Sequence, residues 1–384
     1  MTVPKYQIRY GTANLYTPGS GTILSNGQSL SYTFGVRNPV DVLKASTGSV
    51  TCRMPTTLAT PPNIGNFIAI DWIYQDSPQL SWPIIVCKIT NISYKYAIPY
   101  ASGVAPLDSI TIDFEGAFAQ AGRARTIAGY GNSDTYQDFL TNVGSEAGIT
   151  SSVSNGANPG PAFPFPSVPG TSNSVAERYQ FGVNTVQGRM FEAADQLAFT
   201  NPSDYYIGLV AFSDTTNNAT NQCYDALEFT NYAENLYTKV VVSTLPAATY
   251  TASTGSAPFR QYDVFAYPLN AAKGATLASG ILNRYSSPEI TVSSVSCKAS
   301  AQSVFKLFNL RNSGAQLNLP SIIGTKVSVV FRGVTYGAMV EGATLTATPE
   351  DTRITYFLSG ENLNNLFILG DSVWGVLGQN KLGF

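Results

Sequence analysis

Two short segments of this 384-residue chain repeat at nearly the same distance from a cysteine. The segment Ile110–Gly116 reads ITIDFEG and begins 58 residues after Cys52. The segment Ile354–Gly360 reads ITYFLSG and begins 57 residues after Cys297. The cysteines have matching flanks, SVTCR and SVSCK, in which apolar and polar residues alternate as in half-buried strands. The repeat predicts two copies of one β-domain in a single chain, separated by a middle region of another kind.

The rest of the sequence also favours strands. Its 20 Phe and 22 Tyr outweigh 4 Met, and aromatic residues are enriched in sheets. Short alternating segments follow one another up to about residue 118, separated by Pro-Gly, Asn-Gly and Asn-Pro turns, which is typical of a barrel or sandwich. The expected strands are Ser29–Val36, Ser46–Met54, Asn66–Tyr74, Trp82–Tyr96 and Asp108–Ala117, followed later by Tyr205–Ser213 and Leu236–Val242.

Helical periodicity appears in three places after the first β-region. One stripe follows Asp134, which is expected to cap the helix with Gln137 in a capping box. A second helix is expected to start near Thr185, and a third to precede Pro288. The three apolar stripes are Tyr136, Phe139, Leu140, Val143 and Ala147; Val186, Met190, Ala193, Ala194 and Leu197; and Leu277, Ala278, Ile281, Leu282 and Tyr285.

These patterns divide the chain into three parts. Residues 1–118 are predicted to form the first β-barrel domain, 119–288 an α+β middle region, and 289–384 the second β-barrel domain with a C-terminal tail. Within the middle, residues 150–173 are rich in Pro, Gly and Ser and are expected to form a long loop, which either reaches over a neighbouring subunit or acts as a linker.

Composition excludes several classes of function. The chain has no His, so His-based triads, zinc sites and imidazole acid–base catalysis are excluded. Only 12% of residues are charged and the net charge is −2. Because the chain has few Lys and Arg side chains to neutralise phosphates, a dedicated nucleic-acid binder is not expected. Few charges with many aromatic residues suit a surface covered by other subunits.

The four cysteines are scattered singly and are expected to be buried free thiols, since no C-x-x-C spacing occurs. The N-terminus has no signal-peptide organisation, and the longest apolar stretches are too short to span a bilayer. The sequence therefore predicts a protein that is made in the cytoplasm and has no membrane span.

Candidate catalytic or metal-binding groups are expected to be structural. Asp113 and Glu115 lie two apart on a strand, hence on one face, but no second motif supports a glycosidase pair. The same holds for Glu341 with Glu350 and Asp351. The oxygen-rich run 214–221 lacks the acidic spacing and central Gly of an EF-hand loop and is expected to be a turn. We predict no catalytic, cofactor-binding or metal-binding residue, and no cofactor.

Several segments together resemble the tail proteins of tailed bacteriophages, in particular baseplate or tail-tip hub proteins. The C-terminal stretch Phe367–Phe384 is the most specific, with an aspartate, an apolar cluster and an Asn-Lys-Leu-Gly-Phe ending similar to those of such proteins. The other segments are Ser31–Arg53, Ile110–Thr126, Asp214–Val242 and Thr251–Val264.

The resemblance implies a structural virion protein, not an enzyme. Its two tail-tube-like barrels per chain would let a homotrimer present six barrels to the hexameric tail tube, form a pseudo-six-fold ring around the DNA channel, and leave three-fold order for a spike below. The implied neighbours are the tail tube or distal tail ring above, a spike or tip protein below, and the tape measure protein. The chain would be assembled in the host cytoplasm and act in genome ejection, without sequence-specific nucleic-acid binding.

Two alternatives stay open from the sequence. A distal tail protein would form a hexameric ring beneath the tube with one barrel per chain. A host-glycan-binding tail accessory protein would use exposed aromatic residues, of which Trp72, Trp82, Tyr205 and Tyr206 are the candidates. The tail Phe367–Phe384 is too apolar to hang free in water, so it is either core or a clamp between subunits.

Overall fold

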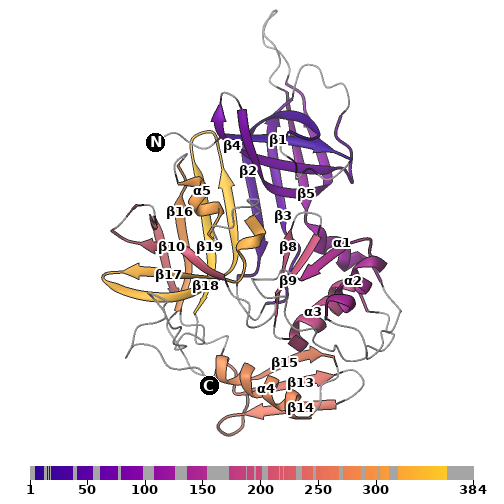
Figure 1. The fold of residues 1–384 in the computed structure, drawn as a ribbon, viewed down its shortest axis with the longest axis vertical. Helices are drawn as coiled ribbons and strands as arrows, with labels where there is room; N and C mark the ends of the chain where they lie inside the picture. The colour runs from indigo at the N-terminus through magenta and orange to yellow at the C-terminus, as the bar shows by residue number, and fades with distance from the viewer. Residues whose placement is uncertain are drawn as a thin grey trace, which may run out of the picture.

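The computed structural model gives a mainly β protein with a few helices (Figure 1). It describes residues 5–12, 15, 17, 19–37, 41–54, 61–76, 79–97, 108–125, 136–153, 173–186, 188–193, 196–200, 206–215, 217–218, 220–230, 236–244, 248–267, 271–286, 291–300, 303–310 and 319–360.

Six strands near the N-terminus close into the first barrel. Their order around it is β1-β4-β5-β6-β3-β2, and β2 pairs with β1 to complete the circle. All neighbours are antiparallel. The strands are β1 (Lys5–Gly11), β2 (Thr22–Gly35), β3 (Thr47–Arg53), β4 (Phe67–Asp76), β5 (Gln79–Lys95) and β6 (Ser109–Glu115). The five strands expected in this region are confirmed, and β1 is an addition.

A second barrel repeats the chain order of the first. The strands run β10-β17-β18-β19-β16, and the circle is completed by β11 and β12, two parts of one path that pair with β10 and β16 respectively. They are β10 (Tyr206–Ser213), β11 (Asn221–Cys223), β12 (Ala226–Thr230), β16 (Thr291–Lys298), β17 (Thr325–Phe331), β18 (Val334–Ala347) and β19 (Thr352–Gly360). The barrels correspond strand for strand, with β11 and β12 together in the place of β2.

The repeated sequence segments occupy the same position in the two barrels. Cys52 on β3 lies opposite Ile110 on β6, and Cys297 on β16 lies opposite Ile354 on β19. The bulge also repeats: the β5–β6 ladder skips a residue between Ile89 and Asn91, and the β18–β19 ladder skips one between Val340 and Gly342. The predicted fold class, two barrels of common topology, is confirmed.

One strand breaks the likeness. In the first barrel β1 runs antiparallel to both of its neighbours. In the second, β10 takes the same position but runs parallel to β11 and β17. A single strand has therefore been reversed while its place in the barrel has been kept.

The two barrels share one sheet of thirteen strands, because β2 pairs with β18. We call this pairing the seam; it joins Leu30–Gly35 to Gly342–Ala347. Gly35 faces Gly342 there, and a Cβ on either would overlap the backbone of the other strand. Gly35 also has φ +73°, a conformation that favours glycine. Buried apolar residues from both barrels make one continuous core cluster.

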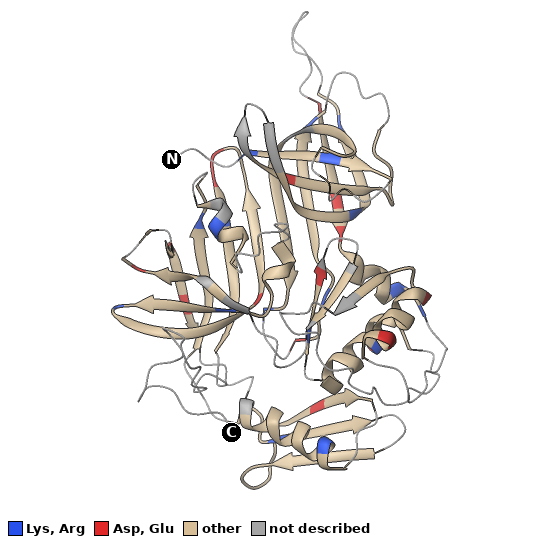
Figure 2. Ribbon diagram, in the orientation of Figure 1, with Lys and Arg blue, Asp and Glu red and all other residues tan. Residues whose placement is uncertain are grey.

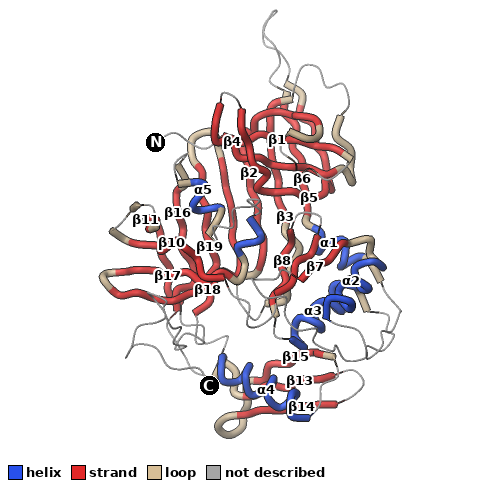
Figure 3. The backbone as a smooth tube through the Cα atoms, viewed as in Figure 1, coloured by secondary structure: helices blue, strands red, loops and turns tan. Residues whose placement is uncertain are grey.

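A helical unit lies in the chain between the barrels, where the helices of Figure 3 gather beside a small sheet. Its elements are α1 (Ala117–Arg123), α2 (Tyr136–Glu146), β7 (Thr150–Val153), α3 (Val175–Val186), β8 (Arg189–Ala193) and β9 (Gln196–Thr200). The helix after Asp134 is confirmed as α2, and Gln137 donates to Thr141 and Ser151. Asp134 lies outside the described residues, so the capping box stays a prediction.

The prediction of a helix that starts near Thr185 is wrong. Helix α3 ends at Val186, and the apolar residues after it form the hairpin of β8 and β9. Met190 and Phe191 are both buried although they point to opposite faces of β8. A strand that is buried on both faces has no period of two, so its apolar residues also fitted a helical stripe.

A second insertion fills the connection between β12 and β16. It holds the three-stranded sheet β14-β13-β15 and the helix α4, which packs on it through Leu277, Ala278 and Leu282. The elements are β13 (Lys239–Thr244), β14 (Ala248–Ser253), β15 (Gln261–Ala266) and α4 (Ala271–Tyr285). The helix before Pro288 is thus confirmed. The division at 118 and 289 stays a prediction, but β10, β11 and β12 lie between those bounds and pair within the large sheet.

The remaining short elements are α5 (Val304–Phe308) and the 3-10 helix η2 (Leu319–Ile322). Of the expected long loop, residues 150–153 form β7, and 154–172 lie outside the described residues, as does the tail 361–384. None of the helices in the described ranges has the length and apolar character needed to cross a membrane.

A buried ion pair fixes the first barrel. The Arg9 guanidinium donates to both carboxylate oxygens of Asp71, at 2.5 and 2.8 Å, and neither side chain is exposed. It also donates to the carbonyl oxygens of Leu15, at 2.9 Å, and Ser20. One side chain thus joins β1 to β4 and holds the turn that leads to β2.

We expect Asp71→Asn to lower the free energy of unfolding by about 3–5 kcal/mol, because it leaves a buried guanidinium without its counter-charge. Asp113→Asn makes the same chemical change on the outside of the barrel and should cost less than about 1 kcal/mol. Urea unfolding of the two variants provides the comparison. Equal losses of unfolding free energy in the two variants would show that the buried ion pair stabilises the fold no more than an exposed carboxylate does.

Candidate functional site

The largest organised feature of the structure is one face of the shared sheet, which runs without interruption over both barrels. The strand order along it is β5-β6-β3-β2-β18-β19-β16-β12, and the seam lies at its centre. Strand alternation puts apolar residues inside the barrels, so the opposite face carries the polar ones.

We call this surface the polar sheet face, and the pairing registers define its members. Most of them are Ser or Thr. They are Asn91, Ser93 and Lys95 on β5; Ser109, Thr111, Asp113 and Glu115 on β6; Thr47, Ser49, Thr51 and Arg53 on β3; Ser29, Ser31 and Thr33 on β2; Thr344 and Thr346 on β18; Arg353, Thr355 and Phe357 on β19; Ser294, Ser296 and Lys298 on β16; and Ala226 and Glu228 on β12.

Hydroxyl groups pair across the strands of this face. Thr51 and Thr111 lie 3.0 Å apart at their Oγ1 atoms, and the Thr355 hydroxyl donates to Ser296 at the same distance. At the seam the Oγ1 atoms of Thr33 and Thr344 are also 3.0 Å apart, so one hydroxyl pair joins the two barrels. Such pairs contribute about 0.2–1 kcal/mol each and keep the face polar.

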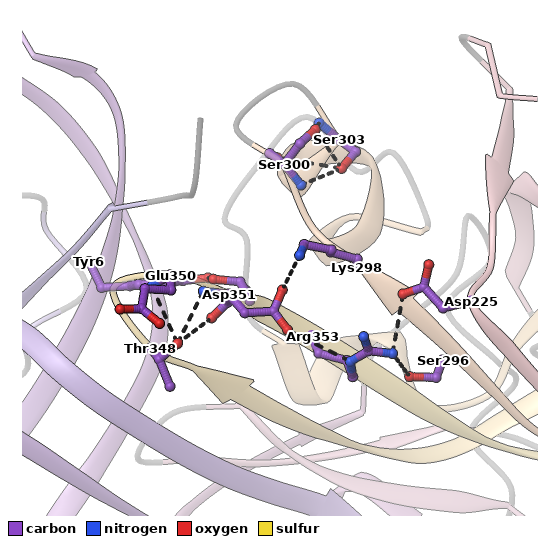
Figure 4. A network of polar contacts seen from close by, with 11 residues as sticks. Tyr6, Asp225, Ser296, Lys298, Ser300, Ser303, Thr348, Glu350, Asp351 and Arg353 are labelled. Carbon is purple, nitrogen blue, oxygen red and sulfur yellow. Dashed lines mark hydrogen bonds and ion pairs between the residues drawn. The ribbon is translucent and has the colours of Figure 1, made fainter. Parts of the chain in front are cut away.

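The cations at the second-barrel end of the face have acidic neighbours (Figure 4). Asp351 lies 3.0 Å from the Lys298 ammonium and 4.0 Å from Arg353. Asp225 lies 3.2 Å from the same guanidinium, which also donates to Ser296. These side chains are nearly half exposed, so the pairs stabilise the fold weakly. Their main effect is to cancel positive charge on the face.

Charged side chains are sparse over the whole molecule, and both signs are scattered along the strands (Figure 2). The five face residues nearest the seam carry hydroxyl groups and no charge: Ser29, Ser31, Thr33, Thr344 and Thr346. The middle of the face is therefore neutral and hydrogen-bonding.

The carboxylates whose spacing resembles a glycosidase pair have structural partners on this face. Asp113 accepts a hydrogen bond from the Asn91 amide at 2.9 Å, and Glu115 pairs with Arg123 of α1. Glu341 is also engaged, because the Ser359 hydroxyl donates to it at 2.6 Å and Arg189 lies 3.3 Å away.

A lysine side chain lies against the oxygen-rich run 214–221, of which residues 216 and 219 lie outside the described residues. The Lys306 ammonium donates to the carbonyl oxygens of Asn218 and Asn221, at 2.8 and 2.7 Å. Asn218 Oδ1 accepts from the backbone N–H of Thr220, as in an Asx turn. A side-chain cation therefore occupies the oxygens that a metal would need, and no cluster of metal-ligating residues occurs in the part of the chain that the structure describes.

The other candidates from the sequence have structural roles where they are described. Cys52, Cys87 and Cys297 are buried free thiols, as predicted, and Cys223 is free and half-buried. Burial raises the pKa of Cys52 to about 12. Trp72 is buried in the core, which removes it from the candidate sugar-stacking set, and Trp82 packs against the core. Tyr205 lies outside the described residues, as does the Tyr206 side chain.

The sequence reasoning missed strand β8, which connects both barrels to the helical unit. Its buried Glu192 accepts backbone N–H bonds from Ser46, at 2.7 Å, and from Phe118, at 2.6 Å. The second bond satisfies a free N–H of helix α1, whose first residue follows Gly116. Burial raises the pKa of Glu192, although these hydrogen bonds act in the opposite direction. Arg189 reaches the second barrel through Glu341.

A cap in the sequence could have located α3. Ser174 and Glu177 form a capping box, in which the Ser174 N–H donates to Glu177 at 2.8 Å and the Glu177 N–H donates to the Ser174 hydroxyl at 3.2 Å. The backbone bond from Ser174 lowers the pKa of Glu177. The S-x-x-E spacing was visible in the sequence, with Ser174 eleven residues before Thr185, near which the helix was predicted to start.

Comparison with known proteins identifies the fold. No protein-family model and no curated protein matches this sequence. Among solved structures, the chain is similar to the 43 kDa tail protein of prophage MuSo2 from Shewanella oneidensis, with 11% identity, a TM-score of 0.61, and coverage of 93% of this chain and 98% of that one. It is also similar to the tail protein from Neisseria meningitidis MC58, with 10% identity, a TM-score of 0.59, and coverage of 94% and 97%.

A third similar structure comes from a secretion system. It is an E. coli component of the type VI secretion system, described as structurally similar to the T4 bacteriophage tail proteins gp27 and gp5, with 10% identity, a TM-score of 0.50, and coverage of 92% of this chain and 77% of that one. The chain therefore has the fold of bacteriophage tail proteins, as its sequence resemblance predicted.

We expect Glu192→Ala to lower the free energy of unfolding by about 2 kcal/mol or more, because it leaves two buried N–H groups without acceptors. Glu350→Ala removes a carboxylate from an exposed turn and should stay within about 0.5 kcal/mol of the parent. Thermal or urea unfolding measures both. A Glu192 variant as stable as the Glu350 variant would contradict the capping role.

Proposed function

We propose that this chain is the hub of a phage tail or a tail-like particle, a structural ring protein with two tube-like barrels per subunit. The observation that carries the proposal is the repetition of one barrel, in register and with the same bulge, within a single polypeptide. Three such chains supply six barrels, so a three-fold ring presents near-six-fold order to a hexameric tube and true three-fold order to a spike.

In this ring the polar sheet face lines the channel. It is the broad surface that both barrels share, and a neutral lining of hydroxyl groups suits the passage of DNA. Tight binding to DNA requires many cations against phosphates, and here the cations near Asp225 and Asp351 are already paired. The channel would therefore guide DNA without retaining it and without reading its sequence.

The proposed neighbours follow from this position. The tail tube or a distal tail ring would lie above, a spike or tip protein below, and the tape measure protein within the channel. The protein would be assembled in the host cytoplasm and reside in the virion tail. Its role would be structural and not enzymatic, since the chain has no His and Asp113 and Glu115 are engaged in the outer wall of the barrel.

The native mass of the purified chain tests the stoichiometry, and a projection image along the ring axis tests the symmetry. We expect a trimer with six similar densities around a central channel. A native hexamer would overturn the hub proposal in favour of a distal tail ring. A monomer at all concentrations would remove support from both.

The neutral lining makes a second prediction. Ser29→Lys with Thr346→Lys adds two cations per chain near the seam and should give the assembly salt-dependent retention of double-stranded DNA, with the log–log salt slope growing by about 0.9 for each phosphate contacted. Ser29→Gln with Thr346→Gln is the matched neutral control. The parent protein should retain little DNA at physiological salt. Tight binding by the parent would contradict a non-adhesive lining.

A further inference from the structure

The second insertion forms a compact unit of its own. We call residues 236–286 the insertion module; it comprises the sheet β14-β13-β15 and helix α4, and it lies at one end of the molecule (Figure 1). Its core is a separate cluster of buried residues. Its two ends meet, because the Tyr237 N–H donates to the carbonyl oxygen of Tyr285 at 2.9 Å. The module can therefore present a binding surface without altering either barrel wall.

The insertion module is basic, unlike the rest of the chain. It contains Lys239, Arg260, Lys273 and Arg284 but a single acidic residue, Asp263, which gives it a net charge of +3 in a chain whose net charge is −2. An excess of positive charge in one module favours an acidic partner.

Three tyrosine rings gather at the end of the module where β13 and β15 begin. Tyr237 precedes β13, Tyr262 is the second residue of β15, and Tyr285 ends α4. The rings of Tyr237 and Tyr262 lie 4.8 Å apart at their centroids, and the Tyr285 ring stands edge-on to them at 6.4 and 6.5 Å. All three residues are half-buried, so each leaves part of its surface accessible.

Cations lie over aromatic rings at the same end of the module. The Arg260 guanidinium is 5.8 Å from the ring centroid of Tyr237, and the Lys239 ammonium is 5.9 Å from that of Phe259. Phe259 is 39% exposed, and every residue from 253 to 261 is exposed. Aromatic surface and positive charge thus occur together on one accessible end of the module.

We propose that this end of the insertion module binds an acidic polysaccharide. The C–H faces of a pyranose ring are apolar and pack on aromatic rings such as Tyr237 and Phe259, which lose little conformational entropy when they are ordered. The carboxylates of the same polysaccharide pair with Lys239 and Arg260, and a guanidinium can donate two parallel hydrogen bonds to one carboxylate.

The tyrosine hydroxyls supply further donors. Burial, together with the nearby Tyr285, Tyr237 and Asp41, raises the pKa of Tyr262 to about 12. Its hydroxyl therefore stays protonated at neutral pH and can donate to a sugar oxygen. Asp41 lies in the connection between β2 and β3, and its carboxylate can accept a hydrogen bond from a sugar hydroxyl.

Other acidic partners fit this surface less well. Double-stranded DNA needs many cations against its phosphates, and only Lys239 and Arg260 are placed at this end of the module. An acidic peptide would pair with the same cations but would not need the exposed aromatic rings. The binding does not depend on the proposed hub function, since it uses residues of the insertion module together with Asp41.

Binding of the purified chain to defined polymers tests this assignment. Polygalacturonate, alginate and hyaluronate are acidic polysaccharides, dextran is a neutral one, and poly-glutamate is an acidic polymer without sugar rings. We expect at least one of the acidic polysaccharides to bind about tenfold or more tighter than dextran and poly-glutamate. Failure of every acidic polysaccharide to bind, or equal binding of poly-glutamate, would overturn the proposal.

Paired variants locate the site. Lys239→Gln with Arg260→Gln should weaken polysaccharide binding about tenfold or more, because it removes both charge-assisted contacts. Lys273→Gln with Arg332→Gln is the matched control: it removes one Lys and one Arg that are also exposed, at the other end of α4 and on the β17–β18 turn, and should leave the binding unchanged. Equal binding by the two double variants would place the interaction elsewhere on the molecule and overturn the proposal.

Phe259→Ala separates sugar stacking from charge. The side chain is exposed, so the variant should keep the melting temperature of the parent while it loses polysaccharide affinity and keeps any weak affinity for poly-glutamate. Full polysaccharide binding by this variant would show binding by charge alone and overturn the saccharide assignment. The native mass reports separately on the hub: a trimer that binds no polysaccharide removes this site and keeps the hub.

Discussion

The structure depends on the antiparallel pairing of β2 with β18. The seam halves of both strands also pair within their own barrels, with β3 and β19, so the two barrels cannot move independently without breaking a ladder of backbone hydrogen bonds. Gly35 and Gly342 let the two backbones approach at the point where the strands leave the seam. The helical unit then fixes the same joint from the side, because β8 bonds to one barrel through Glu192 and to the other through Arg189.

Local pattern was enough to predict much of the fold. The spacing of Cys52 to Ile110 and of Cys297 to Ile354 predicted the duplication, and those residues are indeed paired across strands. Strand β1 was missed although Tyr6, Ile8 and Tyr10 alternate with polar residues as in the other strands. The reversal of β10 could not be predicted, since strand direction depends on partners distant in sequence.

Less of the candidate site could be predicted from the sequence. Alternation indicated which residues leave the core, and it placed Asp113 and Glu115 on one face of a strand, yet it gave no sign that the outer faces of two barrels become one surface. That surface exists because Thr33 and Thr344 meet, 311 positions apart in the chain. The many Ser and Thr residues are visible in the sequence. That they gather on one face could be seen only from the register of the seam.

The uneven placement of the insertions has a consequence for synthesis on the ribosome. All six strands of the first barrel lie between Lys5 and Glu115 and emerge together, so this barrel can fold early. The edge of β2 must then wait for β18, which begins at Val334. During that interval β2 has an open edge, which another nascent chain can pair with. We therefore expect a translational pause or a chaperone at this stage to decide between a closed subunit and premature polymer.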